Sequence, residues 1–308
     1  MASIVTPPGM GCLSLVNANQ RAEAAQASLK KRERMLMPTV IAVAPNGGRR
    51  SKSDHPALPM TTDEIARDAV SCRDAGAAMI HLHVRDRDGR HSLDPELYRE
   101  AIGAVRRMAG QELVVQITTE AIGRYGPEAQ MEVVRAVRPE AASLALRELA
   151  PGESDKGRFA DFMNWMVLER IAPQLILYDA GDAERAVRWA REGVFAAGQV
   201  SLLYVLGRYA PPTAGEPRDL LDLRVADEAM FQDWMACAFG RQETACVVLA
   251  ALLGGNIRVG FENNLVRADG TLASDNADRV RAVAQTLQAV GLRPASPSEL
   301  RAAWFKAG

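Results

Sequence analysis

Residues 39–45, TVIAVAP, form the first of two runs that decide the fold, and residues 78–85, AMIHLHVR, form the second. Both runs are apolar and contain β-branched residues, which is typical of buried strands. Between them, Thr62 can cap a helix that Ala75-Gly76 closes. A strand, a helix and a second strand in this order predict a parallel pair joined by a right-handed crossover.

The same alternation continues along the chain. Six further strands are expected at residues 113–118, 142–146, 175–178, 200–206, 234–239 and 256–261. Further helices are expected at residues 95–110, 127–137, 161–171, 182–192, 220–232, 242–253 and 276–290. The eight strand–helix units carry neither a GxGxxG fingerprint nor a P-loop. They therefore predict an α/β fold, a single-domain (β/α)₈ TIM barrel over residues 38–308.

Residues 1–37 depart from this pattern. They are rich in Ala, Ser, Asn and Gln, and they contain the basic cluster Lys30, Lys31, Arg32 and Arg34. No apolar segment with a cleavage site is present, so a secretory signal is a poor fit. We expect a short, dispensable and partly helical extension. The alternatives are a transit peptide or a true start at Met35 or Met37.

The composition excludes several classes of function. Among 308 residues, 37 Lys and Arg balance 38 Asp and Glu, so no broad surface neutralises nucleic-acid phosphates. No apolar run approaches the roughly 20 residues that a membrane-spanning helix needs. The four cysteines form no CxxC pair, and Cys72 and Cys246 lie in apolar helical contexts as expected for buried thiols. We therefore expect a cytoplasmic protein with neither nucleic-acid nor membrane partners.

His81 and His83 are the sharpest chemical signal in the chain. Side chains two residues apart on a strand point to the same face, and in this barrel that face ends at the active-site rim. Glu262 follows the last strand, which a closed barrel brings close to the second. Two His and one Glu leave one coordination position open, which is typical of catalytic zinc. The alternative is a pair of hydrogen-bonded histidines without a metal.

Other polar residues are expected at the same rim. Arg258 lies four residues before Glu262 and either pairs with a carboxylate or anchors an anionic substrate. The basic cluster over residues 48–52 is either a solvated charge run or a binding site for a carboxylate or a cofactor phosphate. The hydroxyls of Thr118 and Ser143 either cap the backbone or contact substrate.

Three segments together resemble the β-keto acid cleavage enzyme family. They are DHPALP at residues 54–59, HLHVRD at residues 81–86 and GNIRVGFENN at residues 255–264. The resemblance covers the chain from Pro38 to the C-terminus. It implies a TIM barrel, a homotetramer or homodimer, and a zinc ion (Zn2+) held by residues matching His81, His83 and Glu262. It further implies condensation of a β-keto acid with acetyl-CoA, which releases acetoacetate and an acyl-CoA.

The resemblance also implies catalytic and substrate-binding roles for the residues that match the motifs of the family. Arg258 matches the catalytic arginine of the family, and Thr118 and Ser143 match residues that bind the substrate. Asn263 stands where a well-studied member has a proton-abstracting Asp, so the identity of the base is open. Asn46 and Arg49, after the first strand, are expected to contact substrate.

The substrate of this protein is expected to differ in charge from the aminated substrate of one well-studied family member. Arg49 stands where that member has a carboxylate that binds the amine. Ile176 stands where that member has a second acidic residue. An Arg in place of a carboxylate inverts the charge preference. The sequence therefore predicts a neutral or carboxylate-bearing β-keto acid.

Two other functions stay open. One is a different metal-assisted C–C lyase or hydrolase on the same barrel, because a fold does not set the chemistry. The other is a metal-binding homologue that lost activity with the change to Asn263. Contacts to CoA are open as well, with Arg50, Lys52 and Arg241 as candidates.

Overall fold

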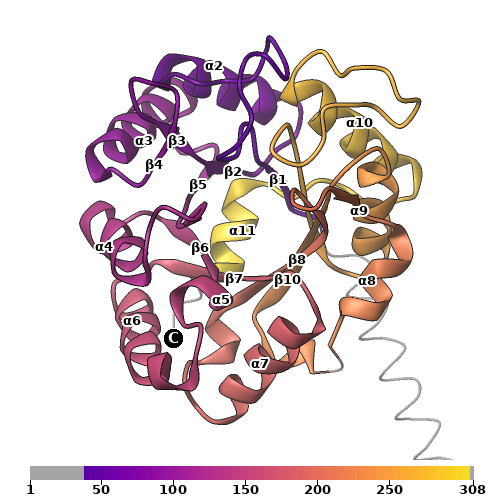
Figure 1. The fold of residues 1–308 in the computed structure, drawn as a ribbon. Helices are drawn as coiled ribbons and strands as arrows, with labels where there is room; N and C mark the ends of the chain where they lie inside the picture. Colours follow the sequence, from indigo (N-terminus) through magenta and orange to yellow (C-terminus); the bar gives the residue numbers. More distant parts are fainter. Residues whose placement is uncertain (1–37, 226, 306–308) are drawn as a thin grey trace, which may run out of the picture. The chain divides into compact units, whose positions relative to one another are not determined.

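Strands and helices alternate along the computed structural model, which describes residues 38–225 and 227–305. Eight parallel strands of these residues form a barrel in the order β10-β11-β1-β2-β5-β6-β7-β8, and pairing of β8 with β10 closes it (Figure 1). They are β1 (Ile41–Val43), β2 (Met79–Leu82), β5 (Val114–Thr118), β6 (Ala141–Ala145), β7 (Ala172–Leu177), β8 (Ser201–Arg208), β10 (Asp233–Ala238) and β11 (Asn256–Val259). The predicted TIM barrel is confirmed. The expected extension, residues 1–37, lies outside the described residues.

Helices of the described residues lie around the barrel wall, and the last of them lies across one end of the barrel (Figure 1). They are α2 (Thr62–Asp74), α3 (Pro95–Ala109), α4 (Pro127–Val137), α5 (Leu146–Leu149), α6 (Lys156–Leu168), α7 (Ala180–Arg191), α8 (Pro217–Leu223), α9 (Glu243–Leu252), α10 (Asn276–Ala289) and α11 (Pro297–Trp304). Asp94 caps α3 by accepting a hydrogen bond from the Glu96 backbone. The cap of α2 is Thr61 rather than the expected Thr62, because Thr61 and Glu64 form a reciprocal capping box.

The second predicted strand is shorter than expected. The sequence predicts it over residues 78–85, whereas β2 ends at Leu82. Val84–Arg85 instead forms β3, which pairs antiparallel with β4 (His91–Ser92). This small hairpin stands at the carboxyl end of β2 and carries the chain from the barrel to α3.

The helix predicted at residues 220–232 is wrong after Leu223. α8 ends at Leu223, and Arg224 takes an extended backbone conformation. The Arg224 guanidinium pairs with Glu228 and lies 4.6 Å from the centre of the Trp234 ring. These side-chain contacts and the 3₁₀ turn Glu228–Met230 replace the expected helical turns.

The last helix, α11, was not predicted, and it covers the amino-terminal end of the barrel. Arg301 donates hydrogen bonds to the carbonyls of Gln111 and Leu113, which directly precede β5. Trp304 donates to Asp233, the first residue of β10. The opposite, carboxyl end is therefore the end left for a site, as in other barrels of this type.

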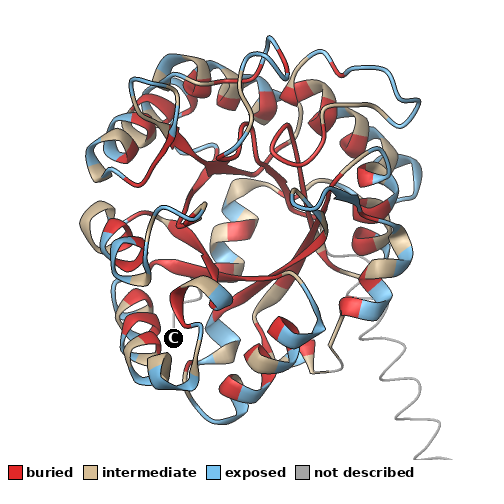
Figure 2. Ribbon diagram, viewed as in Figure 1, coloured by how far each residue is buried: buried red, intermediate tan, exposed pale blue. Residues whose placement is uncertain are grey.

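The strands are buried on both faces, and the helices are buried on the side that faces the strands (Figure 2). One apolar cluster fills the space between strands and helices, and a second fills the inside of the barrel. The barrel interior also holds polar side chains, among them Gln116, Gln174 and Arg258. Cys72 and Cys246 are buried and free, as predicted. No helix of the described residues has the length and hydropathy needed to cross a membrane.

Candidate active site

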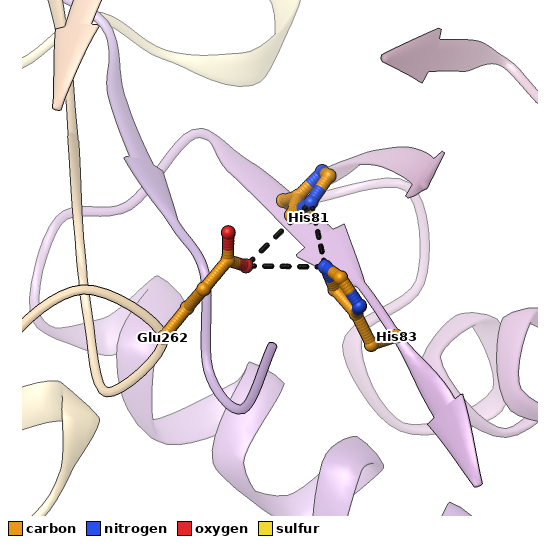
Figure 3. A group of neighbouring side chains, drawn as sticks. All are labelled: His81, His83 and Glu262. Carbon is orange, nitrogen blue, oxygen red and sulfur yellow. Dashed lines mark hydrogen bonds and ion pairs between the residues drawn. The ribbon is translucent and has the colours of Figure 1, made fainter. Parts of the chain in front are cut away.

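His81, His83 and Glu262 converge at the carboxyl end of the barrel (Figure 3). His81 lies on β2, His83 directly follows it, and Glu262 follows β11; both strands flank β1. His83 Nε2 lies 3.2 Å and His81 Nε2 lies 3.6 Å from Glu262 Oε2. The two Nε2 atoms are 3.1 Å apart. The structure thus brings together the three residues predicted as metal ligands.

The protonation of this cluster fits a divalent cation. His81 Nδ1 lies 2.8 Å from the Gln116 side-chain oxygen, so Nδ1 carries the hydrogen and Nε2 presents a lone pair to Glu262. Burial lowers the pKa of His81 to about 3 and that of His83 to about 4, which keeps both imidazoles neutral. Glu262 Oε2 accepts no hydrogen bond from the described residues. His81 Nε2 and Glu262 Oε2 thus present lone pairs beside His83 Nε2, and two neutral imidazoles with one carboxylate are the donor set of a three-ligand zinc site with one open position.

Two glycines allow the chain to pack around Glu262. Gly260 follows β11 with a φ of 136°, and a Cβ there would lie 2.4 Å from the Ala44 carbonyl oxygen. Gly47 has a φ of 59°, and a Cβ there would lie 2.6 Å from Glu262 Cγ. Both positions therefore require glycine for close approach as well as for backbone conformation. Glu262 stands in the turn after β11, beyond the end of the strand.

Arg258 holds the Glu262 carboxylate from the side opposite the histidines. Its Nη2 lies 3.0 Å from Glu262 Oε1, 3.3 Å from Cys237 Sγ and 3.4 Å from Asn263 Oδ1. Burial opposes the ionisation of Glu262, but the Arg258 guanidinium holds the pKa of this carboxyl well below the ordinary value. The carboxylate is thus ionised, with one oxygen paired and the other directed to the histidines.

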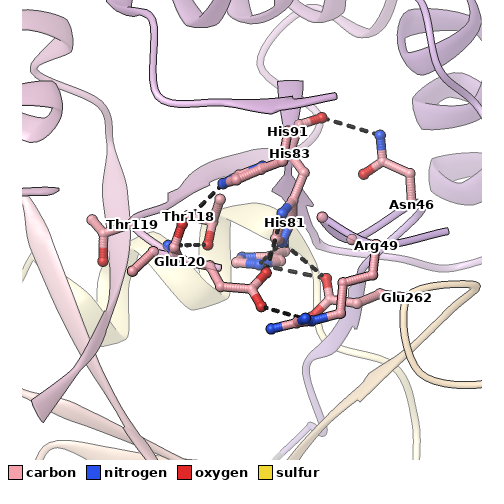
Figure 4. A network of polar contacts seen from close by, with 12 residues as sticks. Asn46, Arg49, His81, His83, His91, Thr118, Thr119, Glu120 and Glu262 are labelled. Carbon is pink, nitrogen blue, oxygen red and sulfur yellow. Dashed lines mark hydrogen bonds and ion pairs between the residues drawn. The ribbon is translucent and has the colours of Figure 1, made fainter. Parts of the chain in front are cut away.

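A cavity of about 320 Å³ opens onto this cluster. Its lining includes Arg49, Thr118, Arg258 and Asn263 as well as the three candidate ligands. It does not include Asn46 or Ser143, two of the predicted substrate contacts. Asn46 donates hydrogen bonds to the carbonyls of Pro59 (2.9 Å) and His83 (3.0 Å), and so holds the end of β2 (Figure 4). The Ser143 hydroxyl is buried opposite Thr118 on the neighbouring strand.

Glu120 is a site residue to which sequence reasoning assigned no role. It follows β5 at the strand end, which is the one signal that could have pointed to it. Its Oε1 lies 3.6 Å from Arg49 Nε, and its Oε2 lies 3.7 Å from His83 Nδ1 (Figure 4). Burial and the nearby Glu262 carboxylate raise its pKa to about 7, although Arg49 acts against them. The same cavity wall carries Tyr209, whose hydroxyl donates to the Glu262 carbonyl.

Comparison with known proteins decides the family. The model of the beta-keto acid cleavage enzyme family matches residues 38–304. The chain belongs to this family. A 3-keto-5-aminohexanoate cleavage enzyme from Fusobacterium nucleatum is 30% identical over 274 residues, which cover 87% of this chain and 97% of that protein. A 3-oxoadipate:acetyl-CoA acetyltransferase from Cupriavidus necator is 28% identical, with 87% and 95% covered.

Solved structures support the fold. The apo structure of ObcA has a TM-score of 0.61 at 17% identity and covers 81% of this chain and 66% of ObcA. At that identity the likeness concerns the barrel alone. Family membership confirms the resemblance drawn from the sequence and the expected class, an enzyme that cleaves the carbon chain of β-keto acids.

Within this β-keto acid cleavage enzyme, the two positions expected to set substrate charge, Arg49 and Ile176, both line the cavity. The three residues considered for CoA binding lie outside its lining. Lys52 pairs with Glu64 at 2.8 Å, and Arg241 donates to the Ala268 carbonyl at 2.9 Å. Arg50 donates to the carbonyl of Phe261 at 2.7 Å, so it supports the segment that bears Glu262.

Proposed function

We propose that this enzyme cleaves a neutral or carboxylate-bearing β-keto acid with acetyl-CoA and binds a catalytic zinc ion. The observation that carries the proposal is the cluster of His81, His83 and Glu262 on a cavity that also presents Arg49. In the reaction, the bond between the keto carbon and the CH₂–COO⁻ unit breaks. That unit joins the acetyl group to give acetoacetate, and the remaining acyl group forms a thioester with CoA. Atoms and charge balance without a further co-reactant.

The donor set supports zinc in particular. Two neutral imidazoles and one carboxylate are the ligands of several catalytic zinc sites, and they leave a position open for substrate. A zinc ion held there supplies a Lewis acid that polarises the keto oxygen. His81, His83 and Glu262 are the residues that would hold it.

Arg258 is the proposed catalytic cation of the chain itself. It is 3% exposed and lines the cavity, where its guanidinium can bind a substrate oxygen in water-excluded surroundings. A preorganised cation aimed at developing negative charge is worth far more at such a site than in water. Its bond to Glu262 also sets its position before substrate arrives.

Asn263 and Thr118 are proposed to orient the substrate. The Asn263 side-chain nitrogen is buried and donates to no acceptor of the described residues, so it is available to a substrate oxygen or a water molecule. An amide cannot accept a proton at neutral pH, so Asn263 orients rather than abstracts. The Thr118 hydroxyl accepts from the Glu120 backbone at 3.0 Å and keeps its hydrogen for a ligand. Asn46 is proposed to act indirectly, through the His83 carbonyl, and Ser143 to act beside Thr118.

The charge at the cavity wall supports the proposed substrate class. Arg49 is 46% exposed in its side chain and faces Glu120 at the edge of ion-pair distance, so its charge is only partly balanced. Ile176 adds an apolar surface. A carboxylate or an alkyl chain suits this wall better than an ammonium group does. One relative named above is a 3-oxoadipate enzyme, whose substrate name denotes a second carboxylate.

The test is a substrate panel on protein whose zinc content has been measured. The panel contains 3-oxohexanoate, 3-oxoadipate and 3-keto-5-aminohexanoate, each with and without acetyl-CoA, and both acetoacetate and the new acyl-CoA are quantified. We expect kcat/KM for one of the first two to exceed that for the aminated acid by about tenfold or more. Preference for the amine would overturn the substrate class.

The same panel separates the other functions. Turnover without acetyl-CoA would indicate a different lyase or a hydrolase. If no substrate reacts, the Asn263→Asp variant distinguishes an inactive homologue, which should gain turnover, from an enzyme that acts on another substrate.

A further inference from the structure

A chain of hydrogen bonds runs through the barrel interior from the candidate ligand His81. His81 Nδ1 lies 2.8 Å from Gln116 Oε1, and Gln116 Nε2 lies 3.1 Å from Gln174 Oε1. Gln174 Nε2 lies 3.2 Å from Ser201 Oγ. All four side chains belong to buried residues on neighbouring or nearby strands, β2, β5, β7 and β8.

The chain ends at Asp233, at the amino-terminal end of the barrel. Ser201 Oγ donates to Asp233 Oδ1, and Trp304 Nε1 donates to Asp233 Oδ2 at 2.7 Å. Asp233 begins β10, and Trp304 ends α11, the helix that covers this end. The metal cluster and Asp233 thus stand at opposite ends of one continuous series of contacts.

The groups at the Asp233 end fix the direction in which every hydrogen bond of this series is donated. An indole N–H only donates, and an ionised carboxylate only accepts. Ser201 donates to the carboxylate and therefore accepts from the amide nitrogen of Gln174. The oxygen of Gln174 then accepts from the nitrogen of Gln116, and the oxygen of Gln116 is left to face His81. His81 must carry its hydrogen on Nδ1, which leaves the Nε2 lone pair free.

We propose that Asp233 is a positioning residue that, through Ser201, Gln174 and Gln116, fixes the tautomer of His81 in which Nε2 can bind the metal. The inference rests on the metal site of the proposed function and is independent of the substrate. Partners that hold the second nitrogen of a ligand histidine set its ring orientation and tautomer, and their loss typically lowers metal affinity about 10- to 100-fold. Here that control is exerted from the far end of the chain of hydrogen bonds.

The Asp233→Asn variant tests the direction of the chain. Trp304 still donates, so the oxygen of the introduced amide has to face Trp304 and its nitrogen has to face Ser201. Ser201 then donates to Gln174, both glutamine amides turn over, and Gln116 donates to His81 Nδ1. His81 would carry its hydrogen on Nε2, the atom required by the metal.

The double variant Asp233→Asn/Trp304→Phe is the matched control. Without the indole donor, the oxygen of the introduced amide is free to accept from Ser201, and the original direction can return. Trp304→Phe alone leaves Asp233 as an acceptor and should keep the tautomer. A merely structural role of Asp233 would make the double variant worse than either single variant, which is the opposite result.

Two measurements report the tautomer of His81 and the affinity for zinc. Both are made at pH 8, because burial raises the pKa of Asp233 and the argument requires its carboxylate to be ionised. Nitrogen-15 spectra of histidine-labelled, zinc-free protein report the tautomer, since the chain has four histidines. Competition between the protein and a fluorescent chelator gives the Kd for Zn2+ alone. We expect Asp233→Asn to move the His81 hydrogen to Nε2 and to weaken zinc binding about 10- to 100-fold, and the double variant to reverse both changes.

The proposal is overturned if His81 keeps its hydrogen on Nδ1 in Asp233→Asn, or if the double variant does not restore the original tautomer. If Asp233→Asn does not fold, Ser201→Ala breaks the same chain at its smallest member and should leave the His81 tautomer mixed; an unchanged tautomer overturns the proposal. If the unaltered protein binds no zinc, the proposed function fails, but the tautomer spectra still decide this inference.

Discussion

Arg258 Nη2 lies 3.0 Å from Glu262 Oε1, whereas Glu262 Oε2 faces the two candidate histidine ligands. The buried Glu262 carboxylate therefore pairs with Arg258 through one oxygen and presents the other oxygen to the candidate metal position. Since the pKa of Glu262 depends strongly on this arginine, the two functions of the carboxylate are coupled.

Arg258→Ala should abolish most of the activity. It removes the proposed binding group for a substrate oxygen and leaves Glu262 buried without its cation, which is costly. We expect kcat to fall by about 100-fold or more, the size seen when one preorganised donor is lost. Steady-state kinetics with acetyl-CoA and the best β-keto acid measure this. Unchanged kcat in Arg258→Ala would remove Arg258 from the mechanism.

Gly260→Ala should weaken zinc binding and destabilise the fold. The new Cβ would meet the Ala44 carbonyl oxygen at 2.4 Å, and the backbone φ of 136° disfavours alanine. Gly291→Ala is the matched control, because Gly291 also has a positive φ but no atom lies within 4 Å of the new Cβ. We expect Gly291→Ala to lower the free energy of unfolding by about 1 kcal/mol and Gly260→Ala to lower it by more. If both variants lose the same free energy of unfolding and Gly260→Ala keeps its zinc affinity, the turn at Gly260 can adjust to the added Cβ.

Arg49→Glu should shift the substrate preference toward amines. A carboxylate at this wall attracts an ammonium group and, next to Glu120, repels a substrate carboxylate. We expect the ratio of kcat/KM for 3-keto-5-aminohexanoate over 3-oxoadipate to rise about tenfold or more. Arg87→Glu makes the same change of charge at an exposed residue outside this cavity and should leave the ratio unchanged. A ratio that does not move in Arg49→Glu would place substrate selection elsewhere.

Asp68 should make stability fall with rising pH. Its carboxylate accepts from Asn276 at 3.0 Å, and burial raises its pKa from the ordinary 3.8 to about 7. Between these values the folded protein holds a proton that the unfolded chain has lost, so stability is lost as pH rises through this window. The slope is at most about 1.4 kcal/mol per pH unit.

Asp68→Asn should remove that slope, because an amide does not titrate. Urea unfolding of both proteins between pH 5 and pH 8 measures the difference, which we expect to grow in favour of the variant as pH rises. Asp161→Asn, at an exposed position, serves as the control. A constant difference across this range would contradict the raised pKa of Asp68.

The metal cluster could be predicted from sequence because its geometry follows from simple periodicities. His81 and His83 are two residues apart at the carboxyl end of β2, and the closed order of strands places β11 on the other side of β1 from β2. For Arg258 the sequence predicted either a pairing with a carboxylate or an anchor for an anionic substrate, without naming Glu262 as the partner. In the structure, the turn at Gly260 brings the two side chains together.

Longer-range arrangements could not be read from the sequence. The side chains from His81 to Asp233 come from five strands, and local patterns do not encode the register between parallel strands. The pairing of Arg49 with Glu120 depends on two loops, and α11 follows a strand–helix pattern that was already complete. These features depend on tertiary contacts, which outweigh local propensity.

Zinc content and turnover, determined together on one sample, test the central claim most directly. The protein is assayed as purified, after removal of metal by a chelator, and after addition of Zn2+, with His83→Gln in parallel. We predict a single zinc ion per chain, loss of acetoacetate and acyl-CoA formation on its removal, recovery with Zn2+, and neither zinc nor turnover in His83→Gln. Full acetyl-CoA-dependent turnover in protein stripped of metal would contradict the account.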